Sequence, residues 1–170
     1  GTRVKAVSAN PDNPTVGQVW YNSTDEALKY KKAGSAGAWS SGGNLNTGRA
    51  AGGMFGTQTA SIYFGGAVSF STTKDIVESY NGSSWTEVAD LNAARDYIRG
   101  AGISTAGLAF GGEPTTAANE SWNGSSWTEV GDLNVAKDYH SGAGTQTSAL
   151  AFAGETPGGL SATTESWNGS

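Results

Sequence analysis

Apolar and polar positions along the chain recur as a tandem pattern. The Trp residues at 39, 85 and 127 are spaced 46 and then 42 residues apart, and each of the last two closes a run of polar residues. The segment Leu-Asn-x-x-Arg or Leu-Asn-x-x-Lys begins at Leu45, Leu91 and Leu133. Self-similarity at a fixed spacing of this size is typical of repeat architectures. The chain is therefore a tandem array.

Each repeat reads as four short strands. In the first repeat, the small-residue apolar stretch 51–56 precedes a β-favouring run at 61–64, and strands are predicted again at 76–80 and 85–88. Asn81-Gly82 lies between the last two, and this dipeptide favours a type I′ hairpin turn, in which both central residues have positive φ. Four strands per repeat, at this spacing, predict propeller blades.

These residues resemble the kelch repeat. The Gly65-Gly66 pair ends the second strand, Tyr80 lies in the third, Trp85 in the fourth, and Arg95 follows ten residues later. The resemblance implies an all-β, kelch-like β-propeller segment of about three four-stranded antiparallel blades, whose ring this chain alone does not close. The repeats are expected at about 39–84, 85–126 and 127–170. Trp122 and Lys137 depart from the Tyr and Arg of the family pattern.

A narrower resemblance concerns phage appendages. The sequence Asn-Gly-Ser-Ser-Trp-Thr-Glu-Val occurs at 81–88 and again at 123–130, and Gly-Thr-Gln-Thr occurs at 56–59 and 144–147. These copies, with residues 13–22, are similar to kelch-like arrays and segments of tail-fibre proteins in tailed bacteriophages. The resemblance implies a non-enzymatic structural and recognition protein of the virion. Its expected partners are other virion proteins and a host-surface glycan or protein, with homo-oligomerisation inside the assembly.

Residues 1–38 precede the array and allow two interpretations. The runs 19–21 and 28–31 are expected to pair as a hairpin, whereas the prolines at 11 and 14 disfavour a helix. In one interpretation this is a separate attachment module. In the other, which we favour slightly, Tyr30 and Trp39 occupy the Tyr and Trp positions of a first partial blade, with residues 33–38 as a longer turn.

Composition excludes several functions. The chain of 170 residues contains no Cys, one His and 26 Gly, and its formal net charge is −5. The lack of Cys excludes a disulfide scaffold, a thiolate zinc site and a cysteine nucleophile. The acidic balance and scattered basic residues provide no surface for nucleic acid. No apolar run is long enough for a transmembrane helix. We expect no membrane insertion, no metal and no cofactor.

Catalytic groups are sparse. A glycosidase needs two carboxylates at a set separation, but Asp96 and Asp138 repeat from unit to unit, which indicates a structural role such as turn capping. His140 aligns with Ile98, so packing is the better explanation than catalysis. We expect no enzyme. A carbohydrate-active propeller enzyme is the first alternative, and a cellular kelch adaptor is the second.

One face is the candidate binding surface. The loops between second and third strands differ between repeats, at 67–77, 113–119 and 155–164. They are expected on the same face as the connections that follow each fourth strand. Variable loops on a rigid scaffold are where recognition residues concentrate, although drift explains the variation equally well. The candidate residues are Arg95, Asp96, Tyr97, Glu113, Asp138, Tyr139, His140 and Glu155.

The number of repeats leaves the propeller incomplete. Closed propellers have four to eight blades. The chain is then either longer in nature, or copies assemble to complete the ring. The third Glu-Ser-Trp-Asn-Gly-Ser stops at Ser170, before its expected Ser-Trp, which favours a longer chain.

Overall fold

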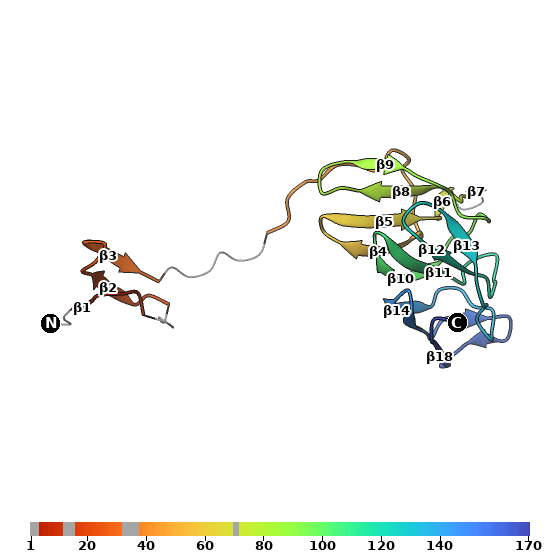
Figure 1. The fold of residues 1–170 in the computed structure, drawn as a ribbon. Coiled ribbons are helices and arrows are strands. Elements are labelled where there is room, and N and C mark those ends of the chain that lie inside the picture. Colours follow the sequence, from red (N-terminus) through yellow and green to blue (C-terminus); the bar gives the residue numbers. More distant parts are fainter. Residues whose placement is uncertain (1–3, 12–15, 32–37, 70–71) are drawn as a thin grey trace. The chain divides into compact units, whose positions relative to one another are not determined.

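The structure is a computed structural model that describes residues 4–11, 16–31, 38–69 and 72–170. It divides into two compact units, Gly1–Ser41 and Gly42–Ser170, which we call the N-terminal unit and the repeat unit. Figure 1 shows that both are built from strands and connecting loops. Within the described ranges, no helix has the length and apolar character needed to span a bilayer.

The N-terminal unit is a small three-stranded sheet. Strand β2 (Val19–Asn22) pairs antiparallel with β3 (Ala27–Tyr30), which confirms the expected hairpin. Strand β1 (Lys5–Val7) pairs parallel with β2, a pairing that the sequence did not suggest. The Asn10 Oδ1 atom accepts hydrogen bonds from Trp20 Nε1 (3.2 Å) and Asn22 Nδ2 (3.0 Å), which ties the entering segment to the sheet.

The assignment of Tyr30 and Trp39 to a first partial blade remains a prediction. Trp39 lies outside these strands with its side chain fully exposed, and Tyr30 is 66% exposed. The longer turn expected at 33–38 falls largely outside the described residues, and so does part of the phage-like segment 13–22. The attachment role likewise remains a prediction.

The repeat unit consists of three meandering antiparallel sheets (Figure 1). The first sheet contains β4 (Gly53–Thr57), β5 (Ala60–Phe64), β8 (Val77–Tyr80) and β9 (Trp85–Glu87). The second contains β10 (Arg99–Ile103), β11 (Ala106–Phe110), β12 (Asn119–Trp122) and β13 (Trp127–Glu129). The third contains β14 (Ser141–Thr145), β15 (Ser148–Phe152) and β18 (Thr164–Trp167). We call them blades 1, 2 and 3.

The blades confirm the all-β fold class with an open ring. Blades 1 and 2 have four antiparallel strands each, in the order predicted, and blade 3 has three. Each blade begins with the small-residue strand and ends after the Trp-containing strand, so the sheets span 53–87, 99–129 and 141–167. In blades 1 and 2 the fourth strand thus closes the sheet that the small-residue strand opens, and the expected repeat bounds remain a prediction. Two short hairpins occupy second-to-third-strand loops: β6 (Ala67–Ser69) with β7 (Thr72–Thr73), and β16 (Glu155–Thr156) with β17 (Gly159–Leu160).

The hairpin after the third strand is confirmed, but its turn type differs from the prediction. Tyr80 pairs with Trp85, so the loop has four residues, and only Gly82 has positive φ (94°). The Asn81 Oδ1 atom accepts the backbone N–H groups of Ser83 (2.9 Å) and Ser84 (3.0 Å). The Asn side chain therefore closes the loop by capping these N–H groups, and a type I′ backbone is not needed.

Adjacent blades bury apolar side chains between them. The Trp127 ring packs against Phe64, with centroids 5.5 Å apart, and against Phe55, at 6.1 Å. Trp122 is 1% exposed and lies 5.1 Å from Trp127. This confirms that the strand tryptophans of blade 2 serve packing between blades.

The inner strand of a blade needs glycine where the neighbouring phenylalanine approaches. A Cβ atom on Gly100 would lie 2.6 Å from Phe64 Cζ, and one on Gly142 would lie 2.6 Å from Phe110 Cζ. Real Cβ atoms do not approach that closely, so these two positions exclude any side chain. Met54 occupies the equivalent place in blade 1, and its side chain is 58% exposed. The outward face of blade 1 therefore differs from those of the other blades.

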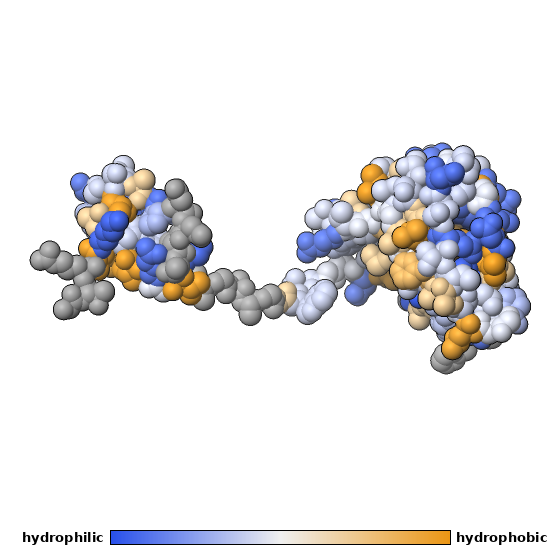
Figure 2. All heavy atoms as spheres, turned by 90° about the horizontal axis from the view of Figure 1, so that it is seen from below, coloured by the Kyte–Doolittle hydropathy of each residue, from blue (hydrophilic) through white to orange (hydrophobic). Residues whose placement is uncertain are grey.

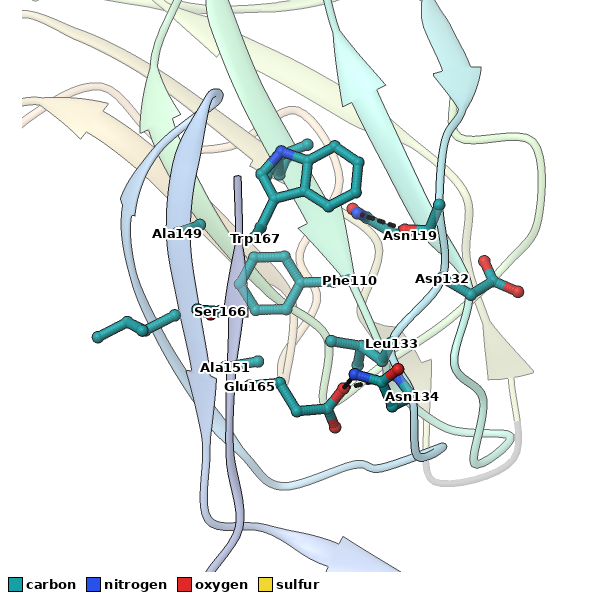
Figure 3. A pocket seen from close by; sticks show the side chains of 13 residues that line it. Phe110, Asn119, Asp132, Leu133, Asn134, Ala149, Ala151, Glu165, Ser166 and Trp167 are labelled. Atoms are coloured by element: carbon teal, nitrogen blue, oxygen red, sulfur yellow. Dashed lines mark hydrogen bonds between the residues drawn. The ribbon is translucent and has the colours of Figure 1, made fainter. Parts of the chain in front are cut away.

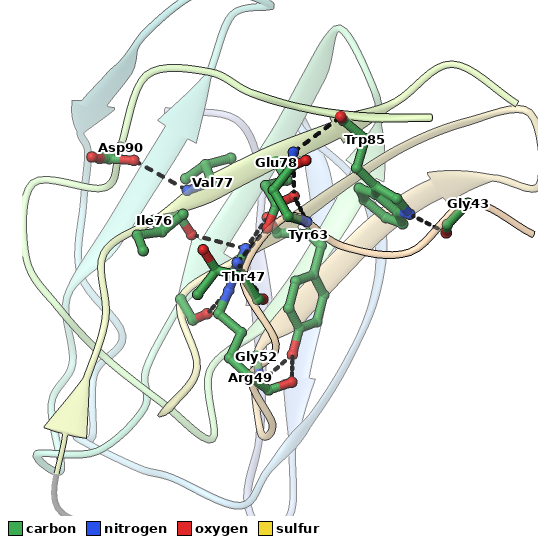
Figure 4. Close-up of polar contacts among 12 residues, drawn as sticks. Gly43, Thr47, Arg49, Gly52, Tyr63, Ile76, Val77, Glu78, Trp85 and Asp90 are labelled. Atoms are coloured by element: carbon green, nitrogen blue, oxygen red, sulfur yellow. Dashed lines mark hydrogen bonds and ion pairs between the residues drawn. The ribbon is translucent and has the colours of Figure 1, made fainter. Parts of the chain in front are cut away.

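A buried ion pair repeats in every blade and joins the connection to the third strand. Arg49 Nη1 lies 2.5 Å from Glu78 Oε1, and Arg95 Nη2 lies 2.5 Å from Glu120 Oε1 (Figure 4). The other oxygen of Glu78 accepts the backbone and side-chain N–H groups of Asn46. Burial raises the pKa of Glu78, but the bonds from Asn46 and the charge of Arg49 outweigh it, so the pKa is below its ordinary value.

Blade 3 keeps the same arrangement with a lysine. Lys137 Nζ lies 2.9 Å from Glu165 Oε1, and the Asn134 side chain donates to Glu165 Oε2 (3.0 Å). The Leu-Asn-x-x-Arg/Lys segment and the repeated glutamate, which the sequence presents separately, are thus one structural clamp. This explains why these charges repeat.

Candidate functional site

The variable loops and the inter-blade connections lie side by side, as expected. In blade 2, Asp96 and Glu113 exchange backbone hydrogen bonds of 3.1 and 2.7 Å. Asp138 and Glu155 do the same in blade 3, at 3.0 and 2.9 Å. The first repeat forms the equivalent bridge between Ala50 and Ala67. Each connection is therefore fixed against the start of its own variable loop, on one face of the array, which we call the loop face.

A cleft of about 680 Å³ opens on the loop face. Its volume lies within the range of small-molecule sites. Four of the predicted residues line it together, namely Asp96, Tyr97, Glu113 and Tyr139. The remaining lining residues are Ala50, Ala51, Ala67, Val68, Ser69, Thr73 and Pro114. Blades 1, 2 and 3 all contribute to this one cleft.

Tyr97 and Tyr139 stack across the boundary between two repeats. Their ring centroids are 3.9 Å apart with 30° between the planes, and both residues have φ of 47°. The left-handed region is unfavourable for a bulky side chain. The hydrogen bond with Tyr97, burial and nearby negative charge raise the pKa of Tyr139 to about 12. The Tyr139 phenol therefore stays neutral near neutral pH.

Asp96 and Asp138 are buried and incompletely hydrogen bonded. Their residues are 7% and 4% exposed, and the Oδ1 atom of each has no hydrogen-bond partner among the described residues. Asp138 Oδ2 accepts the Thr115 hydroxyl at 3.0 Å. Burial raises the pKa of Asp96, and repulsion from Asp138 adds to the rise.

The backbone bridge at these positions forms without an aspartate, so the expected turn capping by Asp96 and Asp138 stays a prediction. In the first repeat, Ala50 forms the same backbone bridge without a carboxylate. The bridge therefore does not require the side chains of Asp96 and Asp138. Asp90 does serve a backbone group, since its Oδ1 accepts the Val77 N–H at 3.1 Å (Figure 4).

Glu113 and Glu155 lie at the surface of the loop face. Glu113 lines the cleft, and its Oε2 accepts the Thr115 hydroxyl at 3.1 Å. Glu155 lines a second, adjacent hollow of about 440 Å³ with Leu160. Tyr139 lines both hollows, which places Glu155 on the far side of this ring from the cleft.

Two predicted residues do not reach the surface. Arg95 is 2% exposed and belongs to the ion-pair clamp, where its Nη1 also donates to the carbonyls of Gly111 (3.0 Å) and Ala118 (2.9 Å). His140 is 1% exposed and packs on Phe110, with ring centroids 5.6 Å apart. Their placement on the binding face is wrong, because both side chains turn into the blade rather than outward.

Burial also decides the charge of His140. Desolvation, with repulsion from Arg99 and Lys137, lowers its pKa to about 4. The imidazole is therefore neutral at neutral pH and serves packing, as its alignment with Ile98 suggested. Within the described residues, no three His, Asp or Glu side chains are grouped as a metal site requires.

Sequence reasoning missed Thr115, which joins Glu113 to Asp138, and the apolar floor of the cleft around Pro114 and Val68. A comparison of the repeats could have pointed to the residues of the cleft. The pair after the clamp residue is Asp-Tyr in the second and third repeats but Ala-Ala at Ala50-Ala51. A pair that the blade can replace by alanine is not a structural requirement.

A smaller cavity lies between blades 2 and 3 (Figure 3). It measures about 50 Å³, and Phe110, Leu133, Ala151 and Trp167 line it. Asn134 donates to Glu165, and Asn119 Nδ2 donates to the Gly131 carbonyl at 3.0 Å, whereas Asn119 Oδ1 has no hydrogen-bond partner among the described residues. The space is a packing defect between blades, too small for an organic ligand.

Together these features define an open β-propeller segment of antiparallel blades with one cleft-bearing face. The chain is similar in fold to the solved structure of YjhT, a kelch-repeat propeller protein, with a TM-score of 0.61 and 14% sequence identity. The similarity covers 87% of this chain and 47% of that one, so the chain spans about half the length of YjhT. No protein-family model matches the sequence. No curated protein matches it either.

Proposed function

We propose that this propeller segment is a non-enzymatic recognition module that binds a ligand through the cleft of the loop face. One observation supports this most strongly. The residues that hold the blades together repeat in all three units. Asp96, Tyr97 and Tyr139, by contrast, occupy positions where the first repeat has alanine, and these three residues line one cleft. A rigid scaffold with a separate set of surface residues is the usual arrangement in binding proteins.

The setting that we propose is the virion of a tailed bacteriophage, as part of a tail fibre or another appendage. The support is the sequence similarity of the Asn-Gly-Ser-Ser-Trp-Thr-Glu-Val copies at 81–88 and 123–130 to such arrays. In that setting the partners are neighbouring virion proteins, copies of the same chain and a host-surface glycan or protein.

Two measurements test this proposal. Quantitative mass spectrometry of purified particles should find the protein at a fixed, symmetric copy number, and its absence from such particles would exclude the virion role. The purified protein should also adsorb to host cells. Replacement of both Tyr97 and Tyr139 by Asn should abolish that adsorption, whereas Glu87→Gln on the exposed edge of blade 1 should not.

A carbohydrate-active enzyme is the second candidate, and one observation favours it. The raised pKa of Asp96 beside the second carboxylate of Asp138 is the kind of asymmetry that acid catalysis of glycoside cleavage uses. If the protein hydrolyses a host glycan and Asp96→Asn or Asp138→Asn abolishes hydrolysis while adsorption persists, this candidate replaces the first.

A further inference from the structure

The charged side chains that line the loop-face cleft have one sign. Among the described lining residues, the only charged ones are Asp96 and Glu113. Asp138 lies close enough to raise the pKa of Asp96 by repulsion, and it is 4% exposed. Two carboxylates therefore line the cleft, the buried Asp138 is joined to one of them through Thr115, and no lysine or arginine among the described lining residues offsets their charge.

Hydrogen-bond donors for these carboxylates are too few. The Thr115 hydroxyl lies 3.1 Å from Glu113 Oε2 and 3.0 Å from Asp138 Oδ2. A hydroxyl has one proton, so it donates fully to only one of them at a time. The Oδ1 atoms of Asp96 and Asp138 have no partner within the described part of the chain. Buried carboxylate oxygens without a donor are costly, and a fold tolerates them at functional sites.

The blade itself does not require these groups. Ala50 and Ala51 occupy the places of Asp96-Tyr97 in the first repeat, with the same backbone bridge and with positive φ at Ala51 (59°). Asp96 and Asp138 thus repel each other, and Tyr97 and Tyr139 are held in an unfavourable backbone conformation. The blade does not need any of these side chains to form. Such costs concentrated at one cleft indicate a ligand that relieves them.

We propose that the cleft binds an organic ammonium group, which Asp96 holds by a charge-assisted hydrogen bond while Asp138 and Glu113 neutralise its charge. This rests on the proposed recognition function and names the ligand chemistry of the same site. An ammonium supplies three donors to a cleft whose carboxylates have few, and its charge offsets the repulsion between them. The tyrosine rings favour a cation further, because the ring face attracts positive charge. An amino sugar and a lysine side chain share this chemistry.

The test compares ligands that differ only in charge. Isothermal titration calorimetry measures binding of a β-1,4-linked glucosamine tetramer and of its N-acetylated counterpart, which keeps the sugar rings and lacks the ammonium. A peptide with two lysines, and its norleucine counterpart, form the second pair. We expect one of the charged ligands to bind at least about tenfold more tightly than its neutral counterpart, the loss typical of a hydrogen bond to a charged group. The pair with the larger difference identifies the source of the ammonium.

Variants locate the interaction. Asp96→Asn and Asp138→Asn keep the side-chain shape and remove repulsion, so both should fold, as thermal melting checks. Each should weaken binding of the charged ligand about tenfold or more. Glu87→Gln, which removes one exposed acidic charge from blade 1, should leave binding unchanged. Added salt should weaken binding of the wild-type protein.

The outcomes separate this inference from the function on which it rests. Equal binding of charged and neutral ligands, no saturable binding of either charged ligand, or unchanged affinity in Asp96→Asn overturns the ammonium site. If adsorption to host cells still requires Tyr97 and Tyr139 in that case, the recognition function stands with another ligand chemistry. If the tyrosine variants adsorb like the wild-type protein, the proposed function itself is wrong.

Discussion

Tyr97 and Tyr139 stack with ring centroids 3.9 Å apart although each residue has a backbone conformation that disfavours tyrosine, with φ of 47°. A stacked aromatic pair contributes about 0.5–1.5 kcal/mol. The left-handed backbone costs roughly 1–2 kcal/mol per residue. Replacing one tyrosine removes the whole stack but relieves the strain at one residue only, so for a single replacement the two terms nearly cancel.

Replacing Tyr97 should therefore change stability only slightly. Asn tolerates the left-handed region, so Tyr97→Asn should alter the free energy of unfolding by less than about 1 kcal/mol. The matched control is Tyr63→Asn, because Tyr63 has ordinary φ, packs on Arg49 and accepts the Gly52 N–H at 3.1 Å. That control should lose roughly 2 kcal/mol. Urea denaturation of both variants checks this, and a larger loss in Tyr97→Asn would contradict the strain argument.

The buried clamp of blade 2 should be sensitive to loss of one charge. Arg95 and Glu120 side chains are each 3% exposed, so Glu120→Ala leaves an uncompensated buried guanidinium. We expect a loss of about 3–5 kcal/mol in the free energy of unfolding. Glu165→Ala in blade 3 should cost less, because the Glu165 side chain is 11% exposed and water can reach the site. Equal losses in guanidinium denaturation would contradict this ranking.

His140 should make stability depend on pH between about 6.5 and 4. Its pKa is lowered to about 4 in the folded protein, so the unfolded chain takes up the proton first as the pH falls. Stability due to the neutral imidazole is complete above the ordinary pKa of 6.5 and decreases until the pH reaches the folded value. The total loss is on the order of 3 kcal/mol.

The variant for this test is His140→Ile, which copies Ile98 of the preceding repeat. Denaturation at a series of pH values should show a smaller decrease across this window in the variant than in the wild-type protein. Both proteins should still lose stability at lower pH, because Glu78 and Glu165 have pKa values below their ordinary range. Parallel pH profiles above pH 4 would contradict the assignment to His140.

Gly100 should not tolerate a methyl group. A Cβ atom there would lie 2.5 Å from the Leu108 carbonyl oxygen and 2.6 Å from Phe64 Cζ, so blades 1 and 2 would have to separate. Gly100→Ala should cost about 1–3 kcal/mol. Gly48→Ala is the control, since nothing lies within 4 Å of its Cβ position. Thermal melting of the two variants distinguishes them, and similar midpoints would show that the blade interface is not tightly packed.

Much of the fold could be predicted because it depends on local and periodic signals. The strand spacing, the hairpin loops after Tyr80 and Trp122, and the pairing of β2 with β3 all follow from short-range pattern. The parallel strand β1 carried no such signal. The clamp between Arg95 and Glu120 joins residues 25 apart, and no local pattern shows which repeated charges meet.

The site was harder to predict because neighbouring residues of one connection point in different directions. Arg95 turns into the blade while Tyr97, two residues later, lines the cleft, and in the next connection His140 is buried while the adjacent Tyr139 lines the cleft. The positive φ at Tyr97 sets this direction, and a tyrosine gives no warning of it in the sequence. Comparison among repeats separated the strands from the variable loops, but only the structure showed that Asp96 has an oxygen without a hydrogen-bond donor.

Met54 makes the first blade of the array differ from the last in how it can contact a further blade. A blade can receive the phenylalanine of its predecessor only where its inner strand has glycine, as at Gly100 and Gly142. Blade 3 still presents Phe152 (37% exposed) and Leu150 (44% exposed) for a following blade, but Met54 and Tyr63 obstruct the same fit on blade 1. A further blade can therefore pack on blade 3 through a copy of the internal contacts, whereas a phenylalanine approaching blade 1 in the same way would meet Met54 in place of a glycine.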